Sequence, residues 1–181
     1  MPETLILEAL EKMDKSIESY QKELNTVRTG RANPNLLDSI VVEYYGVMTP
    51  VKQIASITVP ESSQLYIKPY DKSSLKAIEV AINASDLGLN PQSDGTGIRL
   101  VIPKMTEDRR KELVKHVGKL QENAKVAIRN IRRDLNEALK KLELPEDEEK
   151  GYLDESQDMT DKYVKKVEEL TSVKEKELMT I

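Results

Sequence analysis

The apolar residues of the first 27 positions recur at alternating spacings of four and three. Such a heptad pattern is typical of an amphipathic helix that packs along one face against another helix. Thr29-Gly30 follows and predicts the end of this helix, because glycine readily adopts the left-handed conformation that closes helices. The predicted seam consists of Ile6, Leu10, Met13, Ile17, Tyr20, Leu24 and Val27.

Between residues 30 and 104 the helical period gives way to short runs of β-branched and aromatic residues. Such runs, bounded by Gly, Pro and Ser, are typical of strands. One helix is expected at 72–85, and the Gly- and Pro-rich residues 90–97 predict a loop. The region therefore predicts a small α+β unit. Its expected strands are 39–45, 56–59, 65–69 and 98–102, and its expected apolar helix positions are Leu75, Ile78, Val80 and Ile82.

Helical periodicity returns at Thr106, which we expect to be an N-cap with acidic residues in the first turn. Pro145 breaks this helix, and the four acidic residues after it predict the first turn of another helix, with Pro145 at position N1. The apolar positions are Leu113, Val117, Leu120, Ala124, Ile128, Ile131, Leu135 and Leu142 in the first helix, and Met159, Tyr163, Val167, Leu170 and Leu178 in the second.

Three amphipathic helices need apolar partners, and each other is the simplest choice. We expect residues 1–29 and 105–181 to form a three-helix bundle, with residues 30–104 inserted as a second domain. The two chain crossings, at 28–31 and 102–105, predict a hinge. An ordinary helix end is the alternative for the first crossing. The candidate hinge residues are Arg28, Thr29, Gly30, Arg31, Pro103 and Lys104.

Charge is unevenly distributed along the chain. The sequence has 28 basic and 32 acidic residues, yet residues 105–144 carry eleven basic and seven acidic residues. The helices expected on either side are acidic, with net charges of −3 for residues 1–27 and −6 for residues 145–181. A local reversal of this kind in an acidic protein favours a polyanionic partner, with RNA or DNA as the first candidates.

The basic residues of this segment share one helical face, on which Glu122 is the one clear acidic interruption. Arginine suits a phosphate because its planar fork donates two hydrogen bonds. The alternative is a solvated helix face, and Arg132, nearest to the apolar positions, could also pack its stem on the bundle. We name this face the cationic stripe. Its members are Lys111, Lys115, Lys125, Arg129, Arg132, Arg133 and Lys140.

The composition of the chain excludes several classes of function. The chain has no Cys and a single His, so thiolate chemistry, disulfides and Cys- or His-clustered metal sites are excluded. Asp94 and Gly95–Gly97 match neither a calcium loop nor a P-loop, and no acid–base pair stands out. We therefore expect no enzyme activity, cofactor or metal. The absence of long apolar runs predicts a cytoplasmic protein without a membrane span.

Five blocks of sequence carry a resemblance to a known family. They are Val-Arg-Thr-Gly-Arg-Ala-Asn-Pro at 27–34, Val-Val-Glu-Tyr-Tyr-Gly at 41–46, Ala-Ser-Asp-Leu-Gly-Leu-Asn-Pro at 84–91, Thr-Glu-Asp-Arg-Arg-Lys at 106–111 and Ile-Arg-Asn-Ile-Arg-Arg-Asp at 128–134. In this order they resemble the ribosome recycling factor family over nearly the whole chain.

The resemblance implies an L-shaped, monomeric α+β protein with a three-helix bundle and an inserted small β/α/β domain. It implies binding to 23S rRNA of the large ribosomal subunit after termination. Elongation factor G with GTP would then act on the smaller domain and split the subunits, so this chain would not be the catalyst. The implied rRNA-binding residues are Lys125, Arg129, Arg132 and Arg133, with Arg110 and Lys111.

Two other interpretations stay open at this point. The seam from Ile6 to Val27 would also fit a coiled-coil helical interaction protein without a role in translation. An enzyme that uses the inserted domain ranks last, because no nucleophile–base pair or cofactor loop supports it.

Overall fold

The computed structural model describes residues 1–180. Ile181, the last residue of the predicted bundle range, lies outside the described residues. The chain divides into two compact units. We name Met1–Val27 with Asp108–Thr180 the helical unit, and Arg28–Glu107 the β unit. Long helices and a small antiparallel sheet in one chain confirm the predicted α+β class.

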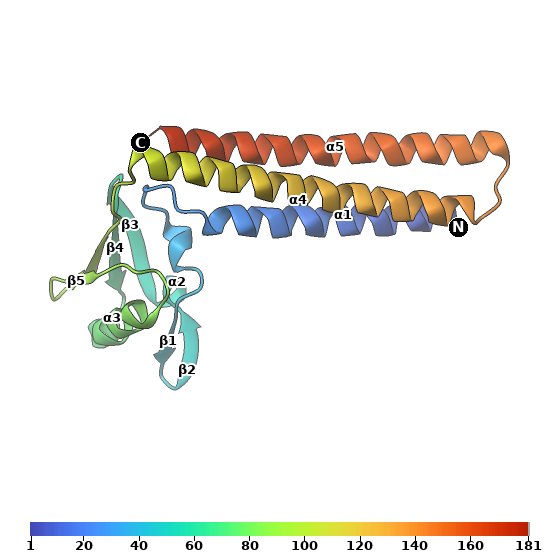
Figure 1. Ribbon diagram of the computed structural model, residues 1–181. Helices are drawn as coiled ribbons and strands as arrows, with labels where there is room; N and C mark the ends of the chain where they lie inside the picture. The colour runs from blue at the N-terminus through green and yellow to red at the C-terminus, as the bar shows by residue number, and fades with distance from the viewer. Residues whose placement is uncertain (181) are drawn as a thin grey trace. The chain divides into compact units, whose positions relative to one another are not determined.

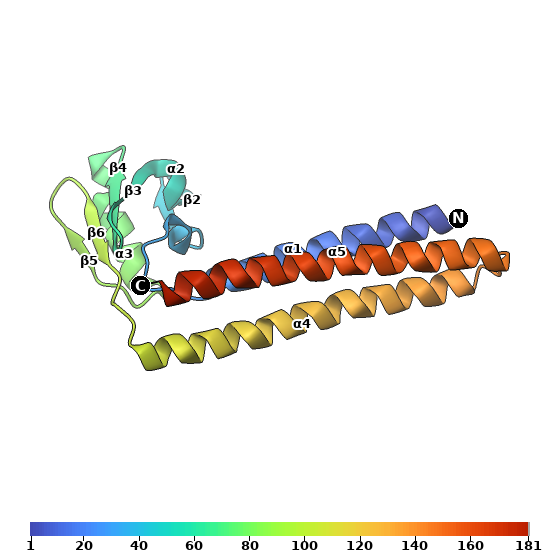
Figure 2. The same ribbon diagram turned by 90° about the horizontal axis from the view of Figure 1, so that it is seen from above.

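The helical unit contains α1 (Pro2–Thr26), α4 (Glu107–Lys140) and α5 (Glu146–Met179). Figures 1 and 2 show α1 and α5 side by side, with α4 running along them and diverging from them toward its N-terminal end. α4 begins directly after Thr106, as the sequence predicts. Pro145 is the N-cap of α5 and not its first helical residue, so the predicted N1 assignment was wrong by one position.

The first and last helices of the chain run parallel and in close contact. Three hydrogen bonds join α1 to α5, and their partners are separated by 149, 149 and 151 residues. A nearly constant separation is expected only when two helices rise in the same direction at the same rate. The pairs are Glu3–Tyr152 at 2.8 Å, Asp14–Tyr163 at 2.5 Å and Tyr20–Thr171.

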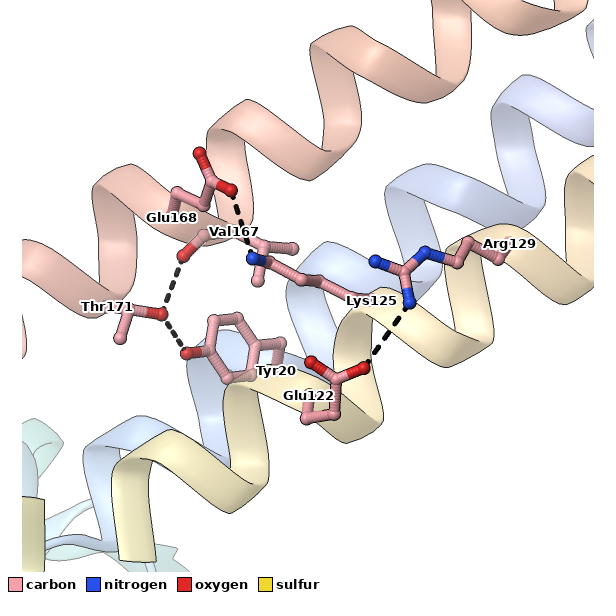
Figure 3. Close-up of polar contacts among 7 residues, drawn as sticks. All are labelled: Tyr20, Glu122, Lys125, Arg129, Val167, Glu168 and Thr171. Atoms are coloured by element: carbon pink, nitrogen blue, oxygen red, sulfur yellow. Dashed lines mark hydrogen bonds and ion pairs between the residues drawn. The ribbon is translucent and has the colours of Figure 1, made fainter. Parts of the chain in front are cut away.

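A pair of buried hydroxyls anchors α1 to α5. Tyr20 is only 2% exposed, so its hydroxyl needs a partner inside the protein. Thr171 gives its single proton to the carbonyl oxygen of Val167 at 2.7 Å. Its oxygen therefore accepts the Tyr20 proton, and both hydroxyls are satisfied (Figure 3).

The apolar pattern predicted for α4 is correct except at its end. Leu142 was predicted to continue the stripe, but α4 ends at Lys140 and Leu142 is 38% exposed in the following turn. Leu139, which the pattern missed, is fully buried. It lies four residues after the buried Leu135 and thus on the same helical face. The prediction that places Leu142 in the core was therefore wrong.

The end of α1 also differs from the sequence prediction. The helix ends at Thr26, and Val27 already has an extended conformation. Thr29-Gly30 therefore does not cap the helix, and that prediction was wrong. Gly30 instead adopts a left-handed φ of 77° in the β unit, after the helix has ended. Glycine suits this backbone conformation because it has no Cβ to clash with the carbonyl oxygen.

The β unit is built on a four-stranded antiparallel sheet in the order β3-β4-β6-β5 and a separate β1-β2 hairpin. Fully buried side chains from the larger sheet and from α3 form its core, including Leu65, Ile67, Ile78 and Ile98. The elements are β1 (Val41–Tyr44), β2 (Val47–Pro50), β3 (Ala55–Glu61), β4 (Gln64–Pro69), α3 (Leu75–Ala84), β5 (Pro91–Ser93) and β6 (Ile98–Val101), with short helices at Pro34–Leu37, α2 (Val51–Ile54) and Lys72–Ser74.

Three local predictions for the β unit were wrong. The strand after the Tyr45-Gly46 turn was missed, and residues 90–97 contain β5 as well as a loop. β3 continues through Pro60, where the sequence predicted its end. It can do so because β3 is an edge strand with an irregularity between Thr58 and Glu61, where proline breaks no ladder bond. Val80, one of the apolar positions expected in the helix of this unit, is 58% exposed.

The turn after β5 is closed by one carboxylate. Asp94 accepts hydrogen bonds from the backbone N–H groups of Thr96 and Gly97 at 2.9 and 2.8 Å, and from the Tyr66 hydroxyl at 3.0 Å. These donors hold the pKa of Asp94 well below its usual range. A Cβ on Gly97 would lie 2.5 Å from the Tyr66 ring, so only glycine fits at this position.

Replacing Leu139 by alanine tests the corrected end of the α4 core. We expect Leu139→Ala to lower the free energy of unfolding by about 2–5 kcal/mol, because it removes a fully buried side chain. Leu142→Ala is the matched control, and we expect it to cost less than about 1 kcal/mol. Urea unfolding followed by circular dichroism measures both. Equal losses in the free energy of unfolding would show that Leu142 belongs to the core as much as Leu139 does.

The contact between Tyr163 and Asp14 makes the free energy of unfolding depend on pH in the alkaline range. Burial and the Asp14 carboxylate raise the pKa of Tyr163 from its ordinary value of 10 to about 12. The folded state thus keeps the phenol proton longer than the unfolded state. This contribution is complete below about pH 10 and is lost as pH rises towards about 12.

We therefore expect the free energy of unfolding to fall more steeply with pH above about pH 10 in the native chain than in Tyr163→Phe. Urea titrations at several pH values between about 9 and 11.5 measure both slopes. Tyr70→Phe, at an exposed position, is the control and should keep the native slope. A native slope in Tyr163→Phe would contradict the assignment.

Candidate nucleic-acid interface

α4 presents the cationic stripe as a consequence of helix geometry alone. Lys125, Arg129, Arg132 and Arg133 lie within nine residues of one another, and the eight steps between the first and the last span about 12 Å of helix. The structure thus brings together the central four predicted site residues. Their side chains nevertheless differ in what they contact, and this difference divides them into two pairs.

Lys125 makes a contact between helices. Its Nζ lies 3.0 Å from Oε1 of Glu168 on α5, and its side chain is only 17% exposed (Figure 3). Half-buried and next to a carboxylate, Lys125 contributes to the packing of α4 on α5. Much of its charge is compensated inside the protein.

Arg129 lies further out on the same face. Its Nη1 is 3.3 Å from Oε1 of Glu122, one of the acidic residues of α4, and both side chains are substantially exposed (Figure 3). An exposed ion pair of this length contributes little to stability. Its main effect is to place a negative charge beside the guanidinium.

Arg132 and Arg133 contact neutral groups. Nη1 of Arg132 donates to Oε1 of Gln157 on α5 at 2.7 Å. Nη2 of Arg133 donates to Oδ1 of Asn130, three residues earlier on α4. Amide oxygens accept these hydrogen bonds without compensating the arginine charge. Arg132 is half-buried, whereas Arg133 is exposed.

Arg110 and Lys111 lie at the other end of α4. Lys111 is exposed and precedes Arg129 by 18 residues, which is five full helical turns and about 27 Å. It therefore shares the face of Arg129 but not its neighbourhood. Arg110 is half-buried and falls, by helical spacing, on the side of the buried Val117 and Ile128. The structure does not bring these two residues together with the central four.

The candidate hinge residues begin and end the β unit. Arg28 donates to the carbonyl oxygen of Asp86 at 3.4 Å, and Thr29 and Gly30 are buried. Arg31, Pro103 and Lys104 are exposed. At the first crossing, Arg28 is therefore joined by a hydrogen bond to Asp86, a residue of the same unit.

Sequence reasoning missed the partners of the cations. Gln157 and Glu168 lie on α5, 25 and 43 residues after the cations that they contact. No local spacing rule connects residues so far apart. Asn130 was detectable in principle, because it precedes Arg133 by three positions on the same helix.

Other kinds of site find no support in the part of the chain that the structure describes. Among residues 1–180, no group of three or more His, Cys, Asp or Glu side chains is arranged to hold a metal ion. No helix among these residues is long and apolar enough to cross a membrane.

The chain combines a helical unit that has a cationic face with a small β unit inserted in its sequence, and comparison identifies the family. The model of the family described as "Ribosome recycling factor" matches residues 20–179. The chain belongs to the ribosome recycling factor family, as the five sequence blocks predicted.

Individual relatives agree along the full length. A ribosome-recycling factor of Acholeplasma laidlawii is 62% identical over 98% of this chain and 96% of its own length. One of Bacillus subtilis is 53% identical over all of both chains.

Solved structures give the same result. A solution structure of a ribosome recycling factor has a TM-score of 0.87 at 42% identity, covering 99% of this chain and 98% of its own. A T. thermophilus ribosome recycling factor, in models with E. coli elongation factor G bound to the E. coli post-termination complex, has a TM-score of 0.70 at 44% identity, covering 99% of each chain.

A double-mutant cycle tests the structural role of Lys125. We expect Lys125→Gln and Glu168→Gln each to lower the free energy of unfolding by less than about 1 kcal/mol, since the pair is partly exposed. The double variant should cost less than the sum of the two, with a coupling of about 0.5 kcal/mol. Thermal or urea unfolding measures the cycle. Strict additivity would contradict a direct Lys125–Glu168 contact in solution.

Proposed function

We propose that this chain, together with elongation factor G and GTP, splits the post-termination ribosome into its subunits and so releases the ribosome from mRNA. The observation that carries the proposal is the likeness, over 99% of each chain, to a ribosome recycling factor placed with elongation factor G on a post-termination complex. The place of action would be the cytoplasm.

The surface proposed to dock on the large ribosomal subunit is the cationic stripe, with the phosphates of 23S rRNA as its ligand. Supporting it are the exposed guanidiniums of Arg129 and Arg133 and the half-buried one of Arg132. A guanidinium can donate two parallel hydrogen bonds to one phosphate. Lys111 would reach phosphates elsewhere along α4, about 27 Å from Arg129, with Arg110 beside it in sequence but on the side of the core.

The β unit is proposed to move during splitting. The crossings at 28–31 and 102–105 would act as its hinge, while elongation factor G supplies the energy through its own GTP hydrolysis. The chain itself would be a mechanical partner and not a catalyst.

The alternative of a coiled-coil interaction protein loses its motivation. Ile6, Met13, Tyr20 and Leu24 of the α1 seam are buried within the protein's own helical unit. A seam already covered by its own chain is not available to a partner helix.

Subunit splitting, followed by light scattering, tests the function. Ribosomes stalled after peptide release are mixed with this protein, elongation factor G and GTP. We expect the scattering to fall only when all three are present. Intact ribosomes in the complete mixture, with factors from a matched source, would refute the proposal.

Charge reversal tests the docking surface. We expect Arg132→Glu to weaken binding to the large subunit by about tenfold or more and to reduce the dependence of log K on log salt, because a phosphate contact is lost. Lys165→Glu, an exposed position of α5, makes the same charge change and should bind nearly as the native chain. Circular dichroism checks that helicity is kept. Equal binding by the two variants would exclude the stripe as the docking surface.

A further inference from the structure

The central cations of the stripe differ in the charge of their partners. Lys125 and Arg129 face carboxylates at 3.0 and 3.3 Å. Arg132 and Arg133 face the amide oxygens of Gln157 and Asn130. Two of the four cations are therefore paired with carboxylates, whereas the other two are held by neutral amide oxygens.

Gln157 is suited to this role by its two unlike ends. Its Oε1 accepts from Arg132 at 2.7 Å, while its Nε2 donates to Oδ1 of Asp161 at 2.8 Å. A guanidinium only donates and a carboxylate only accepts, so the amide orientation is fixed by its neighbours. The amide thus orients Arg132 and keeps the Asp161 carboxylate on its far side.

We propose that Gln157 and Asn130 are positioning residues, which fix the guanidiniums of Arg132 and Arg133 for RNA phosphates without neutralising them. The inference rests on the proposed docking of the stripe on ribosomal RNA, and it names the two charges that do most of the binding. Lys125 and Arg129 take the lesser part, because a phosphate must compete there with Glu168 and Glu122.

The physical basis is the difference between orienting a cation and pairing it. An arginine that is already held loses less side-chain freedom when it binds a phosphate. One hydrogen bond to an amide leaves the other N–H donors of the guanidinium available. A carboxylate in the same place would also orient the arginine, but the phosphate would have to displace it or bind beside its negative charge.

Isosteric changes at Gln157 separate these effects. Gln157→Glu keeps the shape and adds the carboxylate, whereas Gln157→Met keeps the approximate length and removes the hydrogen bonds. Gln21→Glu, at an exposed position of α1, makes the same chemical change away from α4 and is the control for net charge. Binding of each full-length variant to large ribosomal subunits is measured over a range of salt concentrations.

We expect Gln157→Glu to weaken binding by about tenfold. The slope of log K against log salt should become shallower by the amount expected for the loss of roughly one phosphate contact. Gln157→Met should weaken binding only about threefold and keep the native slope, because the charge of Arg132 stays available. Asn130→Asp, a second variant on α4 itself, should act in the same direction as Gln157→Glu. Unfolding temperatures confirm that each variant is folded; a purely structural role would change them and leave the salt slope unchanged.

Arg132→Glu in the same series distinguishes the two possible failures. If Arg132→Glu binds as tightly as the native chain, the docking surface itself is wrong. If Arg132→Glu weakens binding but both Gln157→Glu and Asn130→Asp behave like Gln21→Glu, only the positioning role is overturned. The positioning role is also overturned if Gln157→Met and Gln157→Glu weaken binding equally and show the same slope of log K against log salt.

Discussion

The parallel pairing of α1 with α5 is the contact on which the helical unit depends. It joins the first segment of the chain to the last, through hydrogen bonds between residues about 150 positions apart. One of these bonds is buried and fully satisfied, because Tyr20 donates to Thr171 and Thr171 to Val167. Since an unpaired buried hydroxyl is costly, these bonds favour one register of the two helices over its neighbours.

The register of α5 in turn determines the chemistry of α4. α5 and α4 run antiparallel, and α5 supplies the partners of Lys125 and Arg132. A shift of α5 by one turn would place other side chains beside these cations. The α5 partners of Lys125 and Arg132 therefore depend on the α1–α5 contact, although Tyr20 and Thr171 do not belong to the cationic stripe.

The basic helix α4 packs beside the acidic helix α5. Residues 105–144 carry a net charge of +4 and residues 145–181 a net charge of −6, so the helices attract each other. Full ion pairing along the contact would, however, compensate the charges on which the proposed RNA contact depends. The structure instead pairs Lys125 with Glu168 and Arg132 with the neutral Gln157.

The sequence by itself determined the helices, the cationic stripe and the family. Helical spacing maps directly onto helical faces, so Arg129, Arg132 and Arg133 were placed together without knowledge of the fold. The five blocks of sequence were sufficient for the family. Local rules failed where the surrounding structure decides. Pro60 lies within a strand because that strand is at an edge of the sheet, and α4 ends early enough to exclude Leu142 from the core.

Only the tertiary structure decided which cations of the stripe are paired with a carboxylate. Lys125 and Arg132 are alike in sequence pattern, yet one faces a carboxylate and the other an amide. Both partners lie on α5, tens of residues away, and their placement follows from how two helices pack. Contacts across such a distance leave no periodic signal in the sequence, and this is why the division of the stripe appears only in the folded chain.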